Sequence, residues 1–299
     1  MNGALAISTH PTAIELNTIK RGRPALWRQL VRDRWAFTSV LFLLGITLMA
    51  IFAHVLIPFD INLPDYSARL VPPLTPGHPA GTDQMGRDVL ARVIYGARIS
   101  LIVGFATVIL AAMIGVVIGM LAGYYGGWFD TILMRLVDVQ LSFPFILLAL
   151  TLNAIIGLGL QNIIISLVLA GWVEFARVAR GETLVVREKE FVQAARVVGC
   201  NDLRMLWLHI LPNIATPLIV VATLQVAQFI IAEASISFLG FGVQPPTPAW
   251  GSMLSESLDY IFSGWWLITI PGLLLGLVAL AVNITGDWLR DTLDPRLVL

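Results

Sequence analysis

Apolar residues gather into six long runs separated by shorter polar segments. The runs extend over residues 35–58, 99–123, 136–157, 161–178, 214–237 and 265–287. Charged residues within the runs are few, and they occur singly or near an end. Because a helix needs roughly 20 apolar residues to cross the hydrocarbon core of a bilayer, the pattern predicts an all-α, polytopic membrane protein with six transmembrane helices.

Composition supports this prediction and suggests an orientation. Apolar residues make up 57% of the chain and charged residues only 13%, whereas a soluble domain carries about a quarter charged residues. If both termini are cytoplasmic, every Lys and Arg lies inside except Arg69, Arg87, Arg92 and Arg98. Cytoplasmic loops are typically rich in these cations, so we expect cytoplasmic N- and C-termini.

The runs and the segments between them predict a division of the chain. Residues 1–34 form a cytoplasmic tail without the apolar core of a signal peptide, and 35–58 the first transmembrane helix. Residues 59–97 form an external loop with a short polar helix, capped by Thr82 or Asp83. Residues 98–289 form a five-helix core that includes a cytoplasmic loop at 180–213, and 290–299 form a second tail.

The segment 190–212, which we call the knuckle, is charged and amphipathic. Its apolar positions recur at i, i+3, i+4 and i+7, namely Phe191, Ala194, Ala195 and Val198. Gly199 stands where the end of a helix favours positive φ. Asn201 or Asp202 can cap a second short helix, which Pro212 would close. We therefore expect a helix–turn–helix that a partner protein binds.

Motifs for catalysis are missing. The chain has no G-x-x-x-x-G-K-[ST] phosphate loop, and its four histidines have no metal-ligand spacing. The single cysteine, Cys200, faces the reducing cytoplasm in the predicted topology, so no disulfide is expected. We expect no catalytic residue, no metal site and no cofactor bound by this chain.

Small and polar residues inside the runs have two interpretations each. Ala111, Gly115, Gly119 and Gly123 recur every four residues, a spacing that favours close helix packing. Glu233 is an intramembrane carboxylate and hence a candidate for the substrate path, although it lies near a span end. The polar residues that either line a path or link helices are Asn153, Gln225, Gln228 and Asn283.

Longer stretches carry a specific resemblance. The segment 190–213 resembles the "EAA" coupling loop of ABC importer permeases, with Glu190, Ala194, Ala195, Gly199 and the pair Leu211-Pro212 at its signature positions. Residues 81–101, 122–144, 233–254 and 286–297 resemble the dipeptide/oligopeptide/nickel permease family, in particular its C-type subunit. The resemblance covers roughly residues 35–297, and Cys200 and Leu208 depart from it at the edge of the loop.

The resemblance implies a type I ABC importer permease fold in a bacterial inner membrane. It also implies a second homologous permease, two cytoplasmic ATPases that carry ATP and Mg, and an external substrate-binding protein. The residues expected to couple this chain to the ATPases are Glu190, Phe191, Ala194, Ala195, Gly199, Asp202, Leu211 and Pro212.

The substrate stays open at this point. Similar permeases carry di- and oligopeptides, glutathione, nickel chelates or opine-like compounds. A more distant alternative is an ion-coupled secondary transporter, which would need its own coupling-ion site in discontinuous midplane helices. Glu233 is the one carboxylate considered for that role, and no matched half-sequence repeat accompanies it.

Overall fold

The computed structural model describes residues 26–293, and all regular elements in that range are helices apart from two isolated β-bridges between residues 75 and 88. The helices are α2 (Leu26–Arg32), α3 (Arg34–Ile51), α4 (Ala53–Leu56), α5 (Val89–Tyr125), α6 (Gly127–Leu141), α7 (Phe145–Ile156), α8 (Leu160–Val186), α9 (Glu190–Val197), α10 (Asp202–Arg204), α11 (Leu211–Phe238), α12 (Trp250–Glu256) and α13 (Trp265–Leu293). Short 3-10 turns cover Tyr66–Ala68 and Leu258–Tyr260, and a π-helical turn covers Met205–Ile210. The predicted tails 1–34 and 290–299 lie largely outside the described residues.

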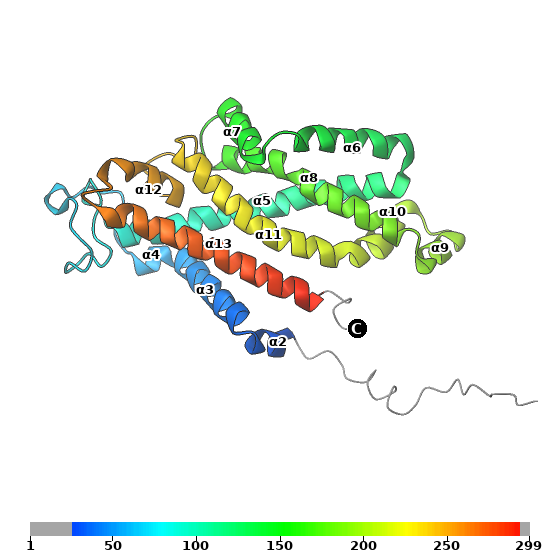
Figure 1. The fold of residues 1–299 in the computed structure, drawn as a ribbon, viewed down its shortest axis with the longest axis horizontal. Coiled ribbons are helices and arrows are strands. Elements are labelled where there is room, and N and C mark those ends of the chain that lie inside the picture. Colours follow the sequence, from blue (N-terminus) through cyan, green and yellow to red (C-terminus); the bar gives the residue numbers. More distant parts are fainter. Residues whose placement is uncertain (1–25, 294–299) are drawn as a thin grey trace, which may run out of the picture.

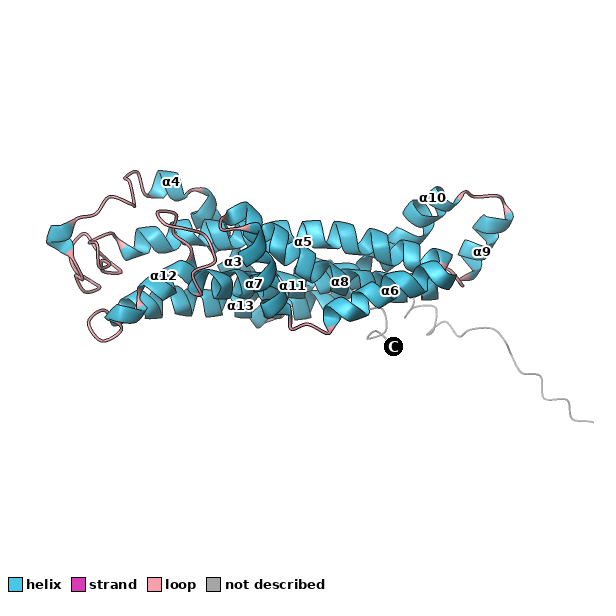
Figure 2. Ribbon diagram, turned by 90° about the horizontal axis from the view of Figure 1, so that it is seen from above, coloured by secondary structure: helices cyan, strands magenta, loops and turns pink. Residues whose placement is uncertain are grey.

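Five of these helices are long and apolar enough to cross a membrane, or six if α6 and α7 together form one span. They lie side by side in an elongated bundle (Figure 1). α9 and α10 project from one end, which we call the knuckle end (Figure 2). α12 and the long loop before α5 lie at the other end, which we call the α12 end.

The candidate span predicted over residues 136–157 is sharply bent. α6 and α7 meet at 92° across a break of three residues, Ser142 to Pro144. Pro144 has no amide hydrogen to continue a helix and restricts the backbone of the residue before it. The chain therefore turns in the middle of an apolar run that hydropathy alone treats as continuous.

The loop before α5 also differs from expectation. Residues 82–88 form no helix, and α5 begins at Val89, where the Asp88 carboxylate accepts a hydrogen bond of 2.9 Å from the Ala91 amide. Thr82 and Asp83 instead bind loop backbone: the Thr82 hydroxyl accepts from the Val71 amide and the Asp83 carboxylate from the Arg87 amide. Their side chains are committed to the loop, so the predicted short polar helix is absent.

The small residues of α5 lie buried against α8. Ala111, Gly115, Gly119 and Gly123 are all buried, and a methyl group on Gly115 or Gly119 would collide with backbone carbonyls of α8. Close helix approach needs small residues in such a place. α5 and α8, which both end beside the knuckle, thus approach each other closely, which gives the knuckle a rigid base.

Candidate functional site

The knuckle begins with α9 and turns sharply at Gly199. Gly199 has φ +86°, and the Cys200 amide donates to the Ala195 carbonyl at 3.0 Å while the Gly199 amide donates to the Arg196 carbonyl. These are the two hydrogen bonds of a Schellman motif, in which glycine is favoured at the left-handed position. Asn201 then caps α10, because its side chain accepts from the Arg204 amide at 2.9 Å.

The second helix of the knuckle does not stop at Pro212. α10 runs through the π-helical turn into α11, and Pro212 lies in the first turn of α11. The amide of Leu211 donates to the Leu206 carbonyl, five residues back. The prediction that Pro212 closes this helix is therefore wrong. Proline is tolerated here because the helical hydrogen bonds change register just before it and it lies in the first turn of α11. The knuckle is therefore continuous with a membrane-spanning helix.

Polar contacts fasten the knuckle to the end of α5. The Asp202 carboxylate accepts hydrogen bonds from the Tyr124 hydroxyl at 2.7 Å and from the Tyr125 hydroxyl at 3.3 Å. The Arg196 guanidinium lies 5.8 Å from the centre of the Tyr124 ring. Arg187 donates to the Gly123 carbonyl at 2.7 Å. The position of the turn is thus fixed by the helix that packs on α8.

The apolar residues of the knuckle divide between an inner and an outer face. Val192 is fully buried against Met205 and Leu206, and Ala195 packs partly on the same cluster. The outer apolar side chains are exposed: Phe191, Val197, Val198 and Leu203 at 41, 88, 88 and 68%, beside the exposed Ala194. Val192, which the periodicity did not single out, is the residue that seats α9.

Two of the polar candidates within the apolar helices bind other segments of the chain: one binds a neighbouring helix and the other binds the loop after α11. The Glu233 carboxylate on α11 is fully buried and accepts from Ser100 on α5 at 3.0 Å and from Ser237 at 2.7 Å. Asn153 on α7 is also buried and donates to the Phe241 carbonyl at 2.5 Å. Neither side chain lines the larger cavity described next.

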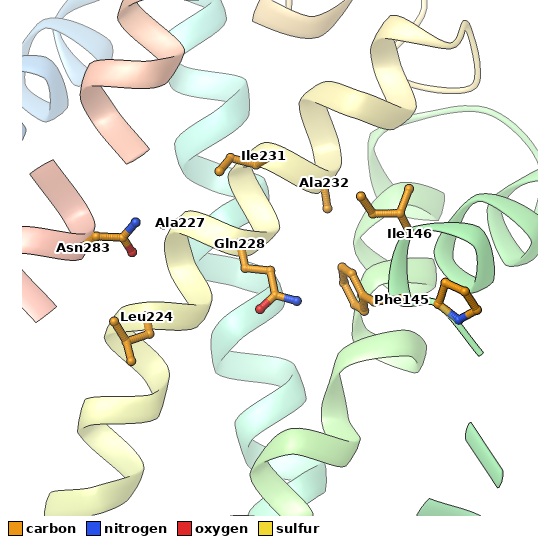
Figure 3. Close-up of a pocket in the computed structure, with 9 residues that line it drawn as sticks. Phe145, Ile146, Leu224, Ala227, Gln228, Ile231, Ala232 and Asn283 are labelled. Carbon is orange, nitrogen blue, oxygen red and sulfur yellow. The ribbon is translucent and has the colours of Figure 1, made fainter. Parts of the chain in front are cut away.

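Gln228 and Asn283 point into a cavity of about 580 Å³ between α7, α11 and α13 (Figure 3). The rest of the lining is apolar: Pro144, Phe145, Ile146, Leu224, Ala227, Ile231 and Ala232. Large apolar cavities with a few polar groups are the usual form of small-molecule sites. This cavity begins at the α6–α7 break, which brings Phe145 to its wall.

A smaller pocket of about 40 Å³ adjoins this cavity and shares Phe145 and Gln228 with it. Its polar lining comes from three helices: Gln140 on α6, Glu174 on α8, and Gln225 and Gln228 on α11. Phe145 on α7 adds an aromatic wall. Sequence reasoning missed Gln140 and Glu174. Glu174 could have been found, because a carboxylate inside the apolar run 161–178 is a functional candidate by its position alone.

At the α12 end, a buried ion cluster holds the long loop. The Asp83 carboxylate lies 2.6 Å from Arg87 Nε and 2.7 Å from Arg92 Nη1. Glu256 on α12 lies 3.2 Å from a terminal nitrogen of each arginine. Both arginines and Asp83 are buried. The cluster therefore ties the loop, the start of α5 and α12 into one unit.

Comparisons with known proteins agree with this architecture. A family profile described as "binding-protein-dependent transport system inner membrane component" matches residues 115–299. A second, described as the N-terminal transmembrane domain of oligopeptide transport permease C, matches residues 25–73. Inward-facing structures of the MetNI methionine ABC transporter include a chain with a TM-score of 0.55 at 19% identity; the match covers 68% of this chain and 96% of that one. This likeness concerns the fold.

Relatives of higher identity cover nearly the whole chain. The di/tripeptide permease protein DppC of Pseudomonas aeruginosa is 39% identical, over 91% of both chains. The glutathione permease protein GsiD of Pectobacterium atrosepticum is 41% identical, over 91% of this chain and 90% of its own. The dipeptide permease protein DppC of Alkalihalophilus pseudofirmus is also 41% identical, over 91% of this chain and 89% of its own. On these grounds the chain belongs to the family of binding-protein-dependent transport system inner membrane components and is a multi-pass permease subunit of an ABC importer.

Proposed function

We propose that this chain and a second, homologous permease form the transmembrane path of an ATP-driven importer for di- and oligopeptides. Two ATPase subunits or domains supply the energy, and an external binding protein delivers the substrate. Membership of the permease family supports the general arrangement. The dipeptide and di/tripeptide relatives, at 39–41% identity, support the substrate class.

The observation that carries this proposal is the exposed apolar surface of the knuckle. Val197 and Val198 are 88% exposed at the turn, although the turn itself is rigidly held by Asp202 and the tyrosines of α5. Apolar side chains on a fixed, projecting helix are typical of a surface that a partner covers. We assign this surface to a groove of the ATPase, which places the knuckle and both termini in the cytoplasm.

In this arrangement the chain supplies motion and not hydrolysis. ATP and Mg bind to the partner ATPases, because this sequence lacks a phosphate loop. The second helix of the knuckle continues into α11, and α11 contributes Gln228 to the wall of the cavity. Displacement of the knuckle by the ATPases would therefore be transmitted along one helix to the substrate path.

Glutathione is the second candidate substrate, because the glutathione permease of Pectobacterium atrosepticum is as similar to this chain as the dipeptide permeases are. Glutathione is itself a tripeptide with a free amino group. The two candidates therefore need the same kind of path, and they differ in the binding protein that each requires.

The test is to co-express the chain with its candidate partners, purify the complex and reconstitute it in liposomes. We expect one copy of this chain, one second permease and two ATPase domains, with ATP-dependent uptake of Ala-Ala or of glutathione. The chain purified alone should release phosphate only at background level. An active complex with two copies of this chain and no second permease would refute the heterodimer, and hydrolysis by the isolated chain would refute the division of labour.

A further inference from the structure

The small pocket beside the main cavity contains a carboxylate that no side chain among residues 26–293 neutralises. Glu174 lies 14 residues into α8 (Leu160–Val186), about 21 Å from its start at 1.5 Å per residue. Residue 174 thus lies within the apolar run 161–178, which is predicted to cross the hydrocarbon core of about 30 Å. In the described part of the chain, the Glu174 carboxylate is in no ion pair and no hydrogen bond. Its side chain is exposed.

The nearest cations on the same helix are already occupied. Arg177, one turn further along α8, lies 2.8 Å from Asp138. Arg180 binds Asp130 through two hydrogen bonds of 2.6 Å. Both aspartates belong to α6. A carboxylate at membrane depth is costly unless it meets a cation or a water-filled space, so Glu174 is available for a cation from outside the chain.

The rest of the polar lining of the pocket offers acceptors. Gln225 is 8% exposed, and its side-chain oxygen is buried without a hydrogen-bond partner among the described residues. Gln228 is exposed, and its amide takes part in no hydrogen bond with described residues. Gln140 is already engaged, because its amide nitrogen donates to the Leu169 and Ala170 carbonyls and its oxygen accepts from the Trp172 indole. The free groups are therefore a carboxylate, a buried amide oxygen and an exposed amide.

These groups match the chemistry of one kind of ligand. An ammonium group carries three donors and no acceptor, and it is attracted by the carboxylate at close range. The pocket, of about 40 Å³, has room for an ammonium group. The adjoining cavity of about 580 Å³ has room for the remainder of a small peptide.

We propose that Glu174, with Gln225 and Gln228, binds the free amino group of the substrate as it passes through the permease. The inference rests on the proposed function and adds a specificity element to it. Phe145 lies on the wall of both spaces, so the amino group enters the small pocket beside this ring while the substrate body stays in the larger cavity. Selection for a free amino group then occurs within the permease itself.

The test uses the complete importer with Cys200→Ser, which removes the only cysteine of this chain, and Ile231→Cys as a reporter. Ile231 lines the larger cavity and is 43% exposed. Alkylation of the new cysteine by N-ethylmaleimide is timed with and without Ala-Ala or N-acetyl-Ala-Ala. We expect Ala-Ala to slow alkylation and N-acetyl-Ala-Ala to have little effect. In Glu174→Gln, the Ala-Ala concentration that halves the alkylation rate should rise about tenfold, which corresponds to the loss of one hydrogen bond to a charged group.

The matched control is Glu182→Gln, the same change two turns further along α8 and outside both pockets. It should leave protection and uptake unchanged. Equal protection by the two peptides, or full protection in Glu174→Gln, would overturn the assignment while uptake of Ala-Ala by the unmodified importer continued. Loss of the second permease from the Glu174→Gln complex would also overturn it, because Glu174 would then pair with that subunit. No uptake of any peptide by the unmodified importer would instead refute the proposed function.

Discussion

The two ends of the bundle place polar and apolar side chains in opposite ways. At the α12 end, Asp83, Arg87 and Arg92 are buried and paired with one another and with Glu256. At the knuckle end, the polar contacts lie at the base while Val197 and Val198 are exposed at the tip. The α12 end therefore completes its own contacts, whereas the knuckle end leaves apolar surface for another protein to cover.

This difference teaches where mutations should act. A change in the buried ion cluster affects the folding of this chain, since its partners lie within the chain. If the knuckle docks to an ATPase as proposed, a change at its tip should affect assembly and coupling instead. Four substitutions test this contrast.

The largest effect is expected from Asp83→Ala at the α12 end. It leaves two buried guanidinium groups with only Glu256 at 3.2 Å from each. Breaking a buried ion pair by removing one partner costs about 3–5 kcal/mol. We expect a lower membrane level and faster proteolysis within residues 59–88. The control is Asp60→Ala, which removes an exposed carboxylate from the same loop. Equal behaviour of the two variants would show that the cluster does not hold the loop.

The next effect is expected from Gly199→Val at the knuckle. A non-glycine residue in the left-handed region costs roughly 1–2 kcal/mol. Apart from the two neighbours in sequence, no described residue has an atom within 4 Å of the added Cβ. The bundle should therefore insert normally, while the valine side chain collides with the bound ATPase. We expect ATPase loss or ATP hydrolysis uncoupled from uptake.

Gly181→Val is the matched control, because Gly181 lies on α8 with equally open space around it and no positive φ. Membrane level, ATPase retention and uptake are measured separately for both variants. Normal uptake with normal ATPase retention in Gly199→Val would contradict the coupling role of the knuckle. A lower membrane level for Gly199→Val, but not for Gly181→Val, would show that Gly199 is needed for folding. The knuckle end would then not differ from the α12 end in the way described.

A smaller effect is expected from Tyr124→Phe at the base of the knuckle. The change removes the 2.7 Å hydrogen bond to Asp202, and a hydrogen bond to a charged group contributes about 1.5–3 kcal/mol. The exposure of Asp202 and the second bond from Tyr125 place the loss at the low end. We expect faster amide hydrogen exchange in α9 and α10 with little change in α12. Tyr125→Phe, which removes the longer bond, should have the weaker effect of the two.

The parts of this structure that depend on local signals followed from the sequence. The turn at Gly199 and the cap at Asn201 need only neighbouring residues, and both were predicted at those positions. The long apolar runs also predicted the number of spans, provided that α6 and α7 count as one. These features depend on backbone conformation and hydropathy, which a sequence reveals directly.

The features that were missed depend on contacts between distant segments. The bend at Pro144 lies inside an apolar run, and hydropathy does not distinguish a bent helix pair from a straight helix. Thr82 and Asp83 have the residue types of helix caps, yet Val71 and Arg92 engage their side chains. The pocket formed by Gln140, Glu174 and Gln225 combines three helices, so no single segment indicates it.

The smallest effect is expected from Glu190→Lys, and it examines the knuckle without altering its backbone. Glu190 is exposed in the first turn of α9 and is in no ion pair within the described chain. Charge at the start of a helix contributes about 0.3–1 kcal/mol, so α9 itself should persist. Any larger loss of ATPase retention would then come from a contact between Glu190 and the ATPase. Raising the salt concentration should weaken ATPase retention by the unmodified permease until it approaches retention by Glu190→Lys, because exposed charge pairs are screened. If retention of both were independent of salt, the contact would be purely apolar, and the role of the knuckle would reduce to the side chains at its tip.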